Sequence, residues 1–305
     1  MSTLHLSWMN HPPSEFTGGA ITIGNFDGVH LGHQALVQAT ARTGSPAIVV
    51  TFDPPPGQLL FPGPIRPPLS TLDDRSRWLH EAGADHVVYL RTDAGLLSLS
   101  PEAFVEDVIV GLFRAKAVVE GANFHFGRGR AGNGVTLRTV GPKYGFAFSE
   151  VPVVVLDDEA VSSSRVRTAI QNGDVSLASK FLGRAYSVCG TVVTGARRGR
   201  TIGFPTANLE GVETLLPKEG VYAVRAIVNG VKYSAAANIG PNPTFGEDAR
   251  KLEVHLLDFT GDIYGRSMNV EFVARLRETR PFAGVPNLIA QLNHDVETTR
   301  RLLAT

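Results

Sequence analysis

Two histidines, His30 and His33, lie three residues apart just after a glycine-containing turn. An apolar strand is predicted before the turn, at residues 20–24, and a helix is predicted to begin at the histidines. Residues three apart share one helix face, and the first turn of a helix offers backbone N–H groups that suit phosphate. The two imidazoles could therefore hydrogen-bond phosphoryl oxygens where charge develops during nucleotidyl transfer.

The alternative for this segment is a strand, a turn and a helix that carry two ordinary surface histidines. The order Gly-Asn-Phe-Asp-Gly-x-His-x-Gly-His favours the phosphate site instead, because glycine permits close approach of the backbone to a ligand. The predicted ATP-binding residues of the turn are Gly24, Asn25, Phe26, Asp27 and Gly28.

A second segment of the first half follows a predicted strand at residues 117–120. Asn123 can hydrogen-bond the edge of a flavin or adenine ring, and Phe124 or Phe126 can stack on one. The alternative is a pair of core aromatic residues at the end of a strand.

A third segment, Ser-Ser-Ser-Arg-Val-Arg, comes between a predicted strand and a predicted helix. Serines at a helix start are usually caps. Two arginines directly behind them favour an anion site. The candidate ATP-binding residues here are Ser162, Ser163, Ser164, Arg165 and Arg167.

The second half carries a basic, glycine-punctuated loop whose backbone N–H groups could wrap a polyphosphate. Thr206 and Asn208 alternate with Ala207, so both side chains would lie on one face of an extended chain. Hydroxyl and amide oxygens suit Mg²⁺ beside phosphates, and the alternative is a basic surface turn. The candidate ATP-binding residues are Gly195, Arg198, Gly199, Arg200, Gly203, Pro205, Thr206 and Asn208.

The elements that must position these groups differ between the two halves. Short apolar runs in the first half alternate with helical segments, which predicts a doubly wound α/β parallel sheet with ligands outside the carboxyl ends of its strands. In the second half, strand patterns and the turn Asn229-Gly230 predict an antiparallel β-barrel with one C-terminal helix at residues 285–303. We place the domain boundary between residues 1–184 and 185–305.

Composition narrows the classes of protein. The 305 residues are enough for two domains, and equal numbers of basic and acidic residues, 29 each, argue against a general nucleic-acid or membrane binder. A single cysteine, Cys189, excludes an intramolecular disulfide and a cysteine metal cluster. No membrane span or signal-peptide pattern is found, so we expect a cytoplasmic protein. The oligomeric state is left open.

The motif around His30 and His33 resembles the G-x-F-D-x-x-H-x-G-H signature of the HxGH nucleotidyltransferases, and the serine-arginine segment resembles the motif that closes the same ATP site. With the Asn-Phe segment, the first half looks like the FMN adenylyltransferase module of prokaryotic FAD synthetases. The resemblance implies that ATP is bound and that a phosphate attacks its α-phosphorus. Pro55 stands where that family usually carries a histidine, which removes one expected phosphate contact.

The segment Gly-Arg-x-x-Gly-Phe-Pro-Thr-Ala-Asn is similar to the ATP and Mg²⁺ segment of riboflavin kinases. That resemblance implies Glu253 as the general base on the ribityl 5′-hydroxyl, a role that suits a carboxylate near Mg²⁺-ATP. Alternation with Leu252 and Val254 leaves open which face of the strand Glu253 occupies.

Together the two halves resemble the bifunctional riboflavin kinase/FAD synthetases. The resemblance implies that riboflavin is phosphorylated to FMN and that FMN is adenylylated to FAD and pyrophosphate, with ATP as co-substrate and Mg²⁺ at both sites. Two alternatives stay open: a riboflavin kinase whose adenylyltransferase half is weak or inactive, with Pro55 as the reason, and a non-enzymatic flavin- or nucleotide-binding protein.

Overall fold

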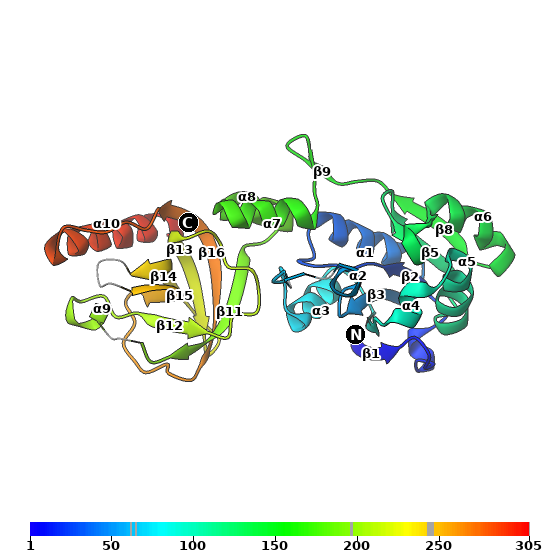
Figure 1. Ribbon diagram of the computed structural model, residues 1–305, viewed down its shortest axis with the longest axis horizontal. Helices are drawn as coiled ribbons and strands as arrows, with labels where there is room; N and C mark the ends of the chain where they lie inside the picture. The colour runs from blue at the N-terminus through cyan, green and yellow to red at the C-terminus, as the bar shows by residue number, and fades with distance from the viewer. Residues whose placement is uncertain (62, 65, 196–197, 243–246, 305) are drawn as a thin grey trace. The chain divides into compact units, whose positions relative to one another are not determined.

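The computed structural model describes residues 1–61, 63–64, 66–195, 198–242 and 247–304. The chain forms two compact units. The first comprises Met1–Arg66 and Ser70–Ser162, and the second comprises Pro67–Leu69 and Ser163–Thr305. Figure 1 shows the elements of both units.

The first unit is built on a six-stranded parallel sheet, which confirms the predicted α/β fold. Apolar, β-branched residues fill its central strands, so these are buried on both faces as parallel strands require. In spatial order the strands are β1 (Ser2–Ser7), β4 (His86–Arg91), β3 (Ala47–Asp53), β2 (Ala20–Ile23), β5 (Ala117–Gly121) and β8 (Ala147–Val151).

Helices connect these strands, and side chains that accept backbone hydrogen bonds cap the start of two of them. Thr71 accepts a hydrogen bond from the Asp74 N–H at the start of α3, and Ser100 accepts one from the Ala103 N–H at the start of α5. The helices of the unit are α1 (Leu31–Thr43), α2 (Pro56–Leu60), α3 (Leu72–Glu81), α4 (Ala94–Ser98), α5 (Pro101–Ala103), the π-helix Phe104–Leu112 and α6 (Gly134–Tyr144).

Short pieces complete the first unit. They are the 3₁₀ turns Ser14–Phe16 and Arg128–Arg130, and the two-residue strands β6 (His125–Phe126), β7 (Gly132–Asn133), β9 (Val155–Leu156) and β10 (Glu159–Ala160). Strands β6 and β7 pair with each other, as do β9 and β10.

The second unit is a closed antiparallel barrel, also as predicted. Its strand order is β11 (Tyr186–Val193), β12 (Ala207–Glu210), β15 (Glu247–Leu256), β14 (Val231–Asn242), β13 (Gly220–Val228) and β16 (Ser267–Arg277). Asn229 and Gly230 join β13 to β14 with φ angles of 52° and 77°. Both angles are positive, as the tight hairpin turn predicted from this dipeptide requires.

Inward-facing apolar side chains fill the barrel in rows that cross from strand to strand. Ala207, Val254, Ala237 and Tyr222 are successive register partners on β12, β15, β14 and β13, and all four are buried. Helix α10 (Val285–Leu303) packs on β13, β14 and β16, and the four-residue α9 (Arg198–Thr201) precedes β12.

Helices α7 (Ser163–Asn172) and α8 (Val175–Leu182) group with the barrel, although the sequence places them before the boundary at residue 184. Helix α8 packs on β16, where the Ser176 hydroxyl donates a hydrogen bond to the Val273 carbonyl over 3.3 Å. The Lys218 N–H donates to the Ile170 carbonyl over 3.1 Å. A strand-helix alternation shows where helices lie along the chain, but not which core they cover, and this explains the difference.

Candidate active sites

The segment after β2 is a tight turn in an uncommon conformation. Phe26 has φ 47°, Gly28 has φ 79° and Val29 has φ 40°. Left-handed backbone is unfavourable for an aromatic or β-branched residue, and such strain concentrates at functional sites. The Phe26 side chain is buried against the His33 ring, with ring centroids 5.1 Å apart. Phe26 therefore shapes the turn from within, and its side chain belongs to the core.

Buried polar groups support this turn from behind. The Asp27 carboxylate lies 3.4 Å from both the Ser70 hydroxyl and the Arg75 guanidinium, and the Gly28 N–H donates to the same hydroxyl over 3.1 Å. Arg75 is only 2 % exposed. Asp27, predicted to bind ATP, is thus ion-paired to the scaffold. Ser70 and Arg75 carry no motif that sequence analysis could have recognised.

Asn25 is the residue of the turn whose side chain is most exposed. The buried Thr51 of β3 donates its hydroxyl to the Asn25 carbonyl over 3.1 Å. The Gly24 N–H donates to the Val50 carbonyl over 3.0 Å. Backbone contacts to β3 therefore fix both residues, and the amide side chain of Asn25 is presented at the carboxyl edge of the sheet.

The two histidines lie together as their spacing predicts. Their rings stack with centroids 3.6 Å apart at 19°. His30 is the N-cap of α1, and its Nδ1 accepts the His33 N–H over 3.3 Å. Because Nδ1 accepts, the proton of the neutral His30 ring is on Nε2, which can donate to an oxygen. A Cβ at Gly32 would lie 3.1 Å from the His30 ring, so the glycine of this motif makes room for that ring.

The second predicted segment divides between core and surface. Asn123 is exposed directly after β5. Phe124 is half-buried and stacks on Phe126, with centroids 5.6 Å apart. Phe126 is buried against Phe104 and lies in the main core of the unit. The alternative of a core aromatic residue therefore fits Phe126. Asn123 and Phe124 remain the residues of this segment that could contact a flavin or adenine ring.

The serine-arginine segment begins α7. Ser162 ends the first unit, and Ser163, Ser164, Arg165 and Arg167 open the helix in the second unit. Arg167 donates to the Pro67 carbonyl over 2.6 Å. The role of these residues at an ATP site stays a prediction.

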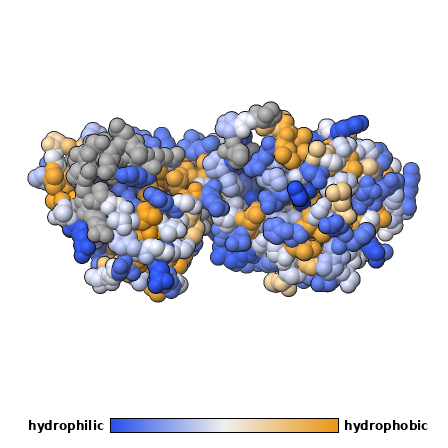
Figure 2. All heavy atoms as spheres, turned by 60° about the horizontal axis from the view of Figure 1, so that its bottom comes forward, coloured by the Kyte–Doolittle hydropathy of each residue, from blue (hydrophilic) through white to orange (hydrophobic). Residues whose placement is uncertain are grey.

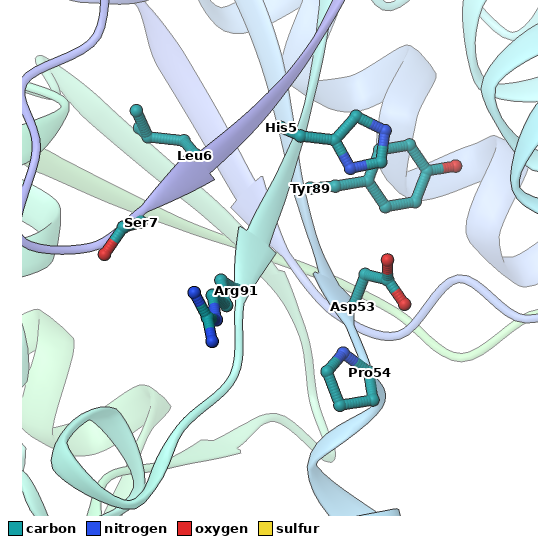
Figure 3. Close-up of a pocket in the computed structure, with 7 residues that line it drawn as sticks. All are labelled: His5, Leu6, Ser7, Asp53, Pro54, Tyr89 and Arg91. Atoms are coloured by element: carbon teal, nitrogen blue, oxygen red, sulfur yellow. The ribbon is translucent and has the colours of Figure 1, made fainter.

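A pocket of about 370 Å³ opens elsewhere at the carboxyl edge of the sheet, lined by His5, Leu6, Ser7, Asp53, Pro54, Tyr89 and Arg91 (Figure 3). His5 stacks on Tyr89, with centroids 4.9 Å apart. Burial raises the pKa of the Tyr89 hydroxyl, which donates to the Leu72 carbonyl over 2.7 Å. Pro54, which lines the pocket, directly precedes Pro55, the position at which the resemblance leads us to expect a histidine.

In the barrel, Glu253 lies between two asparagines. It pairs in register with Asn208 of β12 on one side and with Asn238 of β14 on the other. Its chain neighbours Leu252 and Val254 are buried in the barrel, so the alternation of a strand turns Glu253 to the outer face. This answers the question that the sequence left open. Asn238 was not predicted, because only the strand register brings it to this row.

The glycine loop folds onto the two candidate Mg²⁺ ligands. A side chain at Gly195 would overlap the Asn208 amide, and one at Gly199 would overlap the Phe204 carbonyl and lie 3.7 Å from the Thr206 hydroxyl. Gly203, with φ 89°, ends the turn after α9. The side chain of Arg198 lies outside the described part of the chain, and Arg200 is exposed.

The Phe-Pro-Thr segment is fixed to β15. His255 bonds the Pro205 carbonyl through Nδ1 over 2.8 Å, and its ring meets Phe204 edge-on at 5.5 Å. Both contacts set the position of Thr206 relative to β15. The Thr206 and Asn208 side chains are half-buried, as expected of groups in a cradle.

These residues fit a magnesium ion that arrives with a nucleotide. The Thr206 hydroxyl and the Asn208 amide are hard oxygen donors, and Gly195 and Gly199 allow the loop backbone to lie close to them where a Cβ would collide with the Asn208 amide or the Phe204 carbonyl. Both donors are neutral, so phosphate oxygens and water would have to supply the remaining ligands, as is usual for Mg²⁺. Within the described residues no group of three His, Cys, Asp or Glu side chains could hold a metal.

Helix α10 is attached to the barrel through a buried ion pair. Arg277 donates twice to Asp295, over 2.8 and 3.0 Å, and Asp295 is 3 % exposed. Gln291 donates to the same carboxylate over 2.9 Å. Arg277 and Arg280 both lie over the Phe282 ring, at 5.6 and 5.4 Å. The segment before α10 is thus held at one end of β16.

The fold and the two candidate sites define a two-site, nucleotide-dependent transferase. The parallel sheet carries paired histidines at a helix start, and the barrel carries a glycine loop and a strand carboxylate. Residues 13–165 match the FAD synthetase family model, and residues 182–303 match the riboflavin kinase model. The chain belongs to the bifunctional riboflavin kinase/FMN adenylyltransferase family.

Individual relatives match almost from end to end. The bifunctional riboflavin kinase/FMN adenylyltransferase of Escherichia coli K12 is 37% identical over 96% of this chain and 94% of its own length. The Bacillus subtilis protein of the same name is 36% identical, covering 99% and 98%. A crystal structure from Streptococcus pneumoniae, described as a macrolide-efflux protein, is 31% identical with a TM-score of 0.86, covering 97% of this chain and 98% of that one. Both halves therefore share their fold with a solved structure.

On the face shown in Figure 2, hydrophobic residues form small separate patches among hydrophilic ones. Among the helices of the described residues, none is long and apolar enough to cross a bilayer.

Proposed function

We propose that the barrel transfers the γ-phosphoryl group of ATP to riboflavin, giving FMN and ADP, and that the α/β unit transfers AMP from a second ATP to FMN, giving FAD and pyrophosphate. The observation that carries the proposal is the match to bifunctional relatives over 94 to 98% of their own length, with the residues of both motifs present in this sequence.

In the kinase step, Glu253 would accept the proton of the ribityl 5′-hydroxyl as its oxygen attacks phosphorus. Asn208 and Asn238 flank this carboxylate on the neighbouring strands. Thr206 and Asn208 would hold Mg²⁺ with the triphosphate, and the bound ion would neutralise charge that develops on the phosphoryl oxygens. Backbone N–H groups between Gly195 and Gly203 would bind the phosphates.

In the adenylyl step, no protein base is needed because the FMN phosphate is already an anion. His30 and His33 would donate hydrogen bonds to the α-phosphoryl oxygens, where negative charge develops. Asn25 would help to hold the nucleotide, and Asn123 with Phe124 would meet the flavin or adenine ring. Ser162, Ser163, Arg165 and Arg167 would bind the triphosphate, and Mg²⁺ would accompany it. Catalysis would rest on positioning and charge neutralisation.

A time course tests this function. The purified protein is incubated with riboflavin, ATP and Mg²⁺, and the flavins are separated by chromatography. We expect FMN to appear first and then to convert to FAD. FMN that accumulates without FAD would support the alternative of an inactive adenylyltransferase half. If neither FMN nor FAD forms, both proposed activities are contradicted and the alternative of a binding protein is favoured.

A further inference from the structure

Strands β2 and β5 separate before β2 ends. The two strands are neighbours at the centre of the sheet (Figure 1), but they pair only at Ala20–Ala117 and Ile21–Val118. On its other edge β2 pairs with β3 as far as Ile23. After β2 the chain continues to β3, which is the neighbour of β2 on one side, whereas β5 is its neighbour on the other side. A crevice is therefore expected between their carboxyl ends, as at other switch points of open α/β sheets.

The side chain of Glu120 lies where the two strands separate. Its Oε1 accepts the Ile23 N–H over 2.6 Å, and the residue is 1 % exposed. This N–H points away from β3, because the next one, of Gly24, donates to Val50 of β3. Glu120 therefore replaces the strand pairing that β2 and β5 have lost, and it does so one residue before the turn that carries Asn25.

A buried carboxyl group at this position costs free energy. Burying a polar group costs free energy unless it is hydrogen-bonded, and the residues before Glu120 in β5, Val118 and Val119, are apolar and fully buried. Burial raises the pKa of Glu120 well above its ordinary value. The uncharged acid keeps an oxygen that can accept the Ile23 N–H. A valine at position 120 would leave that buried donor without a partner.

Glu120 also adjoins the second loop of the candidate site. Gly121 ends β5, and Asn123 follows within the exposed segment. Glu120 itself belongs to β5 and directly precedes Gly121, so its hydrogen bond to Ile23 ties the end of β5 to the last residue of β2. These two strand ends lead into the two loops predicted to hold the nucleotide and the ring.

We propose that Glu120 is a positioning residue for adenylyl transfer, which fixes the turn at Gly24–Gly28 relative to the loop at Gly121–Phe124. The inference rests on the proposed adenylyltransferase function. Glu120 touches neither substrate. It sets the separation of two loops that bind different parts of the reacting pair, and a misplacement of about 1 Å at such a site can lower the rate about 100-fold.

Three variants separate this role from a merely structural one. Glu120→Gln keeps the length of the side chain and an accepting oxygen. Glu120→Asp keeps the acid but is one methylene shorter, and Glu120→Val has no acceptor. The matched control is Glu150→Val, because Glu150 is the register partner of Glu120 on β8 and is exposed. For each full-length protein, kcat and KM are measured for FAD formation from FMN and ATP. Kinase activity and the melting temperature are measured on the same samples.

We expect Glu120→Gln and the control Glu150→Val to keep kcat for FAD formation within about threefold. Glu120→Asp and Glu120→Val should lower kcat about 10- to 100-fold. In both variants KM for ATP should change less than kcat, and FMN formation should stay unchanged. If Val fails to fold, the contrast between Gln and Asp carries the test. The proposal is overturned if Gln loses activity as Asp does, if both Asp and Val keep kcat, or if each loss equals the fraction of unfolded protein. If the unsubstituted protein makes no FAD from FMN, the proposed function fails, and this inference fails with it.

Discussion

The two candidate sites are assembled in opposite ways. In the α/β unit, the site residues from Gly24 to His33 are contiguous, and they share a strained turn with side chains that face inward. In the barrel, Asn208, Asn238 and Glu253 are far apart in sequence, and strand register aligns them. A contiguous motif is visible in the sequence, but it contains both residues that support the turn and residues that could contact a ligand. In a row built by strand register, the outward-facing site residues are separated from the buried core residues, but their alignment is visible only in the structure.

The largest effect should come from the barrel carboxylate. Glu253→Gln should lower FMN formation from riboflavin about 10²- to 10⁴-fold, the range typical of a lost general base. The rate of FAD formation from added FMN should not change. Initial rates with each flavin check this, and Glu271→Gln, on β16 of the same barrel, is the control. A Glu253→Gln protein that still made FMN at the normal rate would refute the assignment of the base.

The histidine site should show a comparable loss in the other reaction. His33→Asn should lower FAD formation from FMN about 10²- to 10³-fold, because one donor to the developing charge is lost. FMN formation should remain as before. The exposed His11 provides the control, His11→Asn. Equal losses in His33→Asn and His11→Asn would contradict the placement of the phosphoryl oxygens at the paired histidines.

Glycine substitutions compare how tightly the two sites are built. Gly195→Ala overlaps the Asn208 amide, and we expect about a 10-fold loss of FMN formation. Gly32→Ala only crowds the His30 ring, at 3.1 Å, so FAD formation should fall a few-fold. Gly57→Ala meets nothing within 4 Å and serves as the control. The rates of FMN and FAD formation are measured for each variant. A loss of FAD formation in Gly195→Ala, or of FMN formation in Gly32→Ala, would contradict the assignment of these glycines to separate sites.

Pro55 allows a gain of function. It precedes α2 with φ −57° and ψ 137°, a conformation that histidine can adopt. Pro55→His should raise FAD formation about 10-fold, since a hydrogen bond to a charged group contributes about 1.5–3 kcal/mol. Pro56→His is the matched control, measured in the same assay at saturating FMN. An unchanged rate would show that the family's histidine contact is not missed in this chain.

The smallest effect concerns stability alone. Arg300 bonds both carboxylate oxygens of Asp258, over 2.6 and 2.7 Å, and lowers the pKa of that acid. A lowered pKa means that the stabilisation is present above the ordinary pKa of Asp and disappears as pH falls through the folded value. Asp258→Asn should therefore lower the melting temperature slightly at pH 7, and this difference should shrink as the pH is lowered below the ordinary pKa of Asp. In 1 M salt the difference at pH 7 should shrink, because the pair is exposed. A large shift that ignores salt would contradict this.

Much of the fold was predictable because the periodicity of apolar residues reports burial directly. The parallel sheet and the barrel follow from it, and the hairpin follows from the Asn229-Gly230 dipeptide. The π-helix Phe104–Leu112 does not, because the periodicity of apolar residues does not distinguish it from an ordinary α-helix. A Cβ at Gly111 would lie 2.9 Å from the Glu106 carbonyl, and only the structure reveals that close approach.

The site was predictable where a motif is contiguous, and less so where packing decides. The stacking of His30 on His33 follows from their spacing. The inward ion pair of Asp27 does not, because Arg75 comes from a helix 48 residues further along the chain. Phe126 is buried because Phe104 and Phe124 cover it. Local spacing carries no information about such long-range partners.

The most direct test of two separate sites is complementation. Glu253→Gln and His33→Asn are supplied with riboflavin, ATP and Mg²⁺, first apart and then mixed in equal amounts. Alone, Glu253→Gln should make neither FMN nor FAD, and His33→Asn should stop at FMN. The mixture should make FAD, because FMN released by one protein can be adenylylated by the other. A mixture that made no FAD, although each protein kept its own remaining activity, would contradict the account.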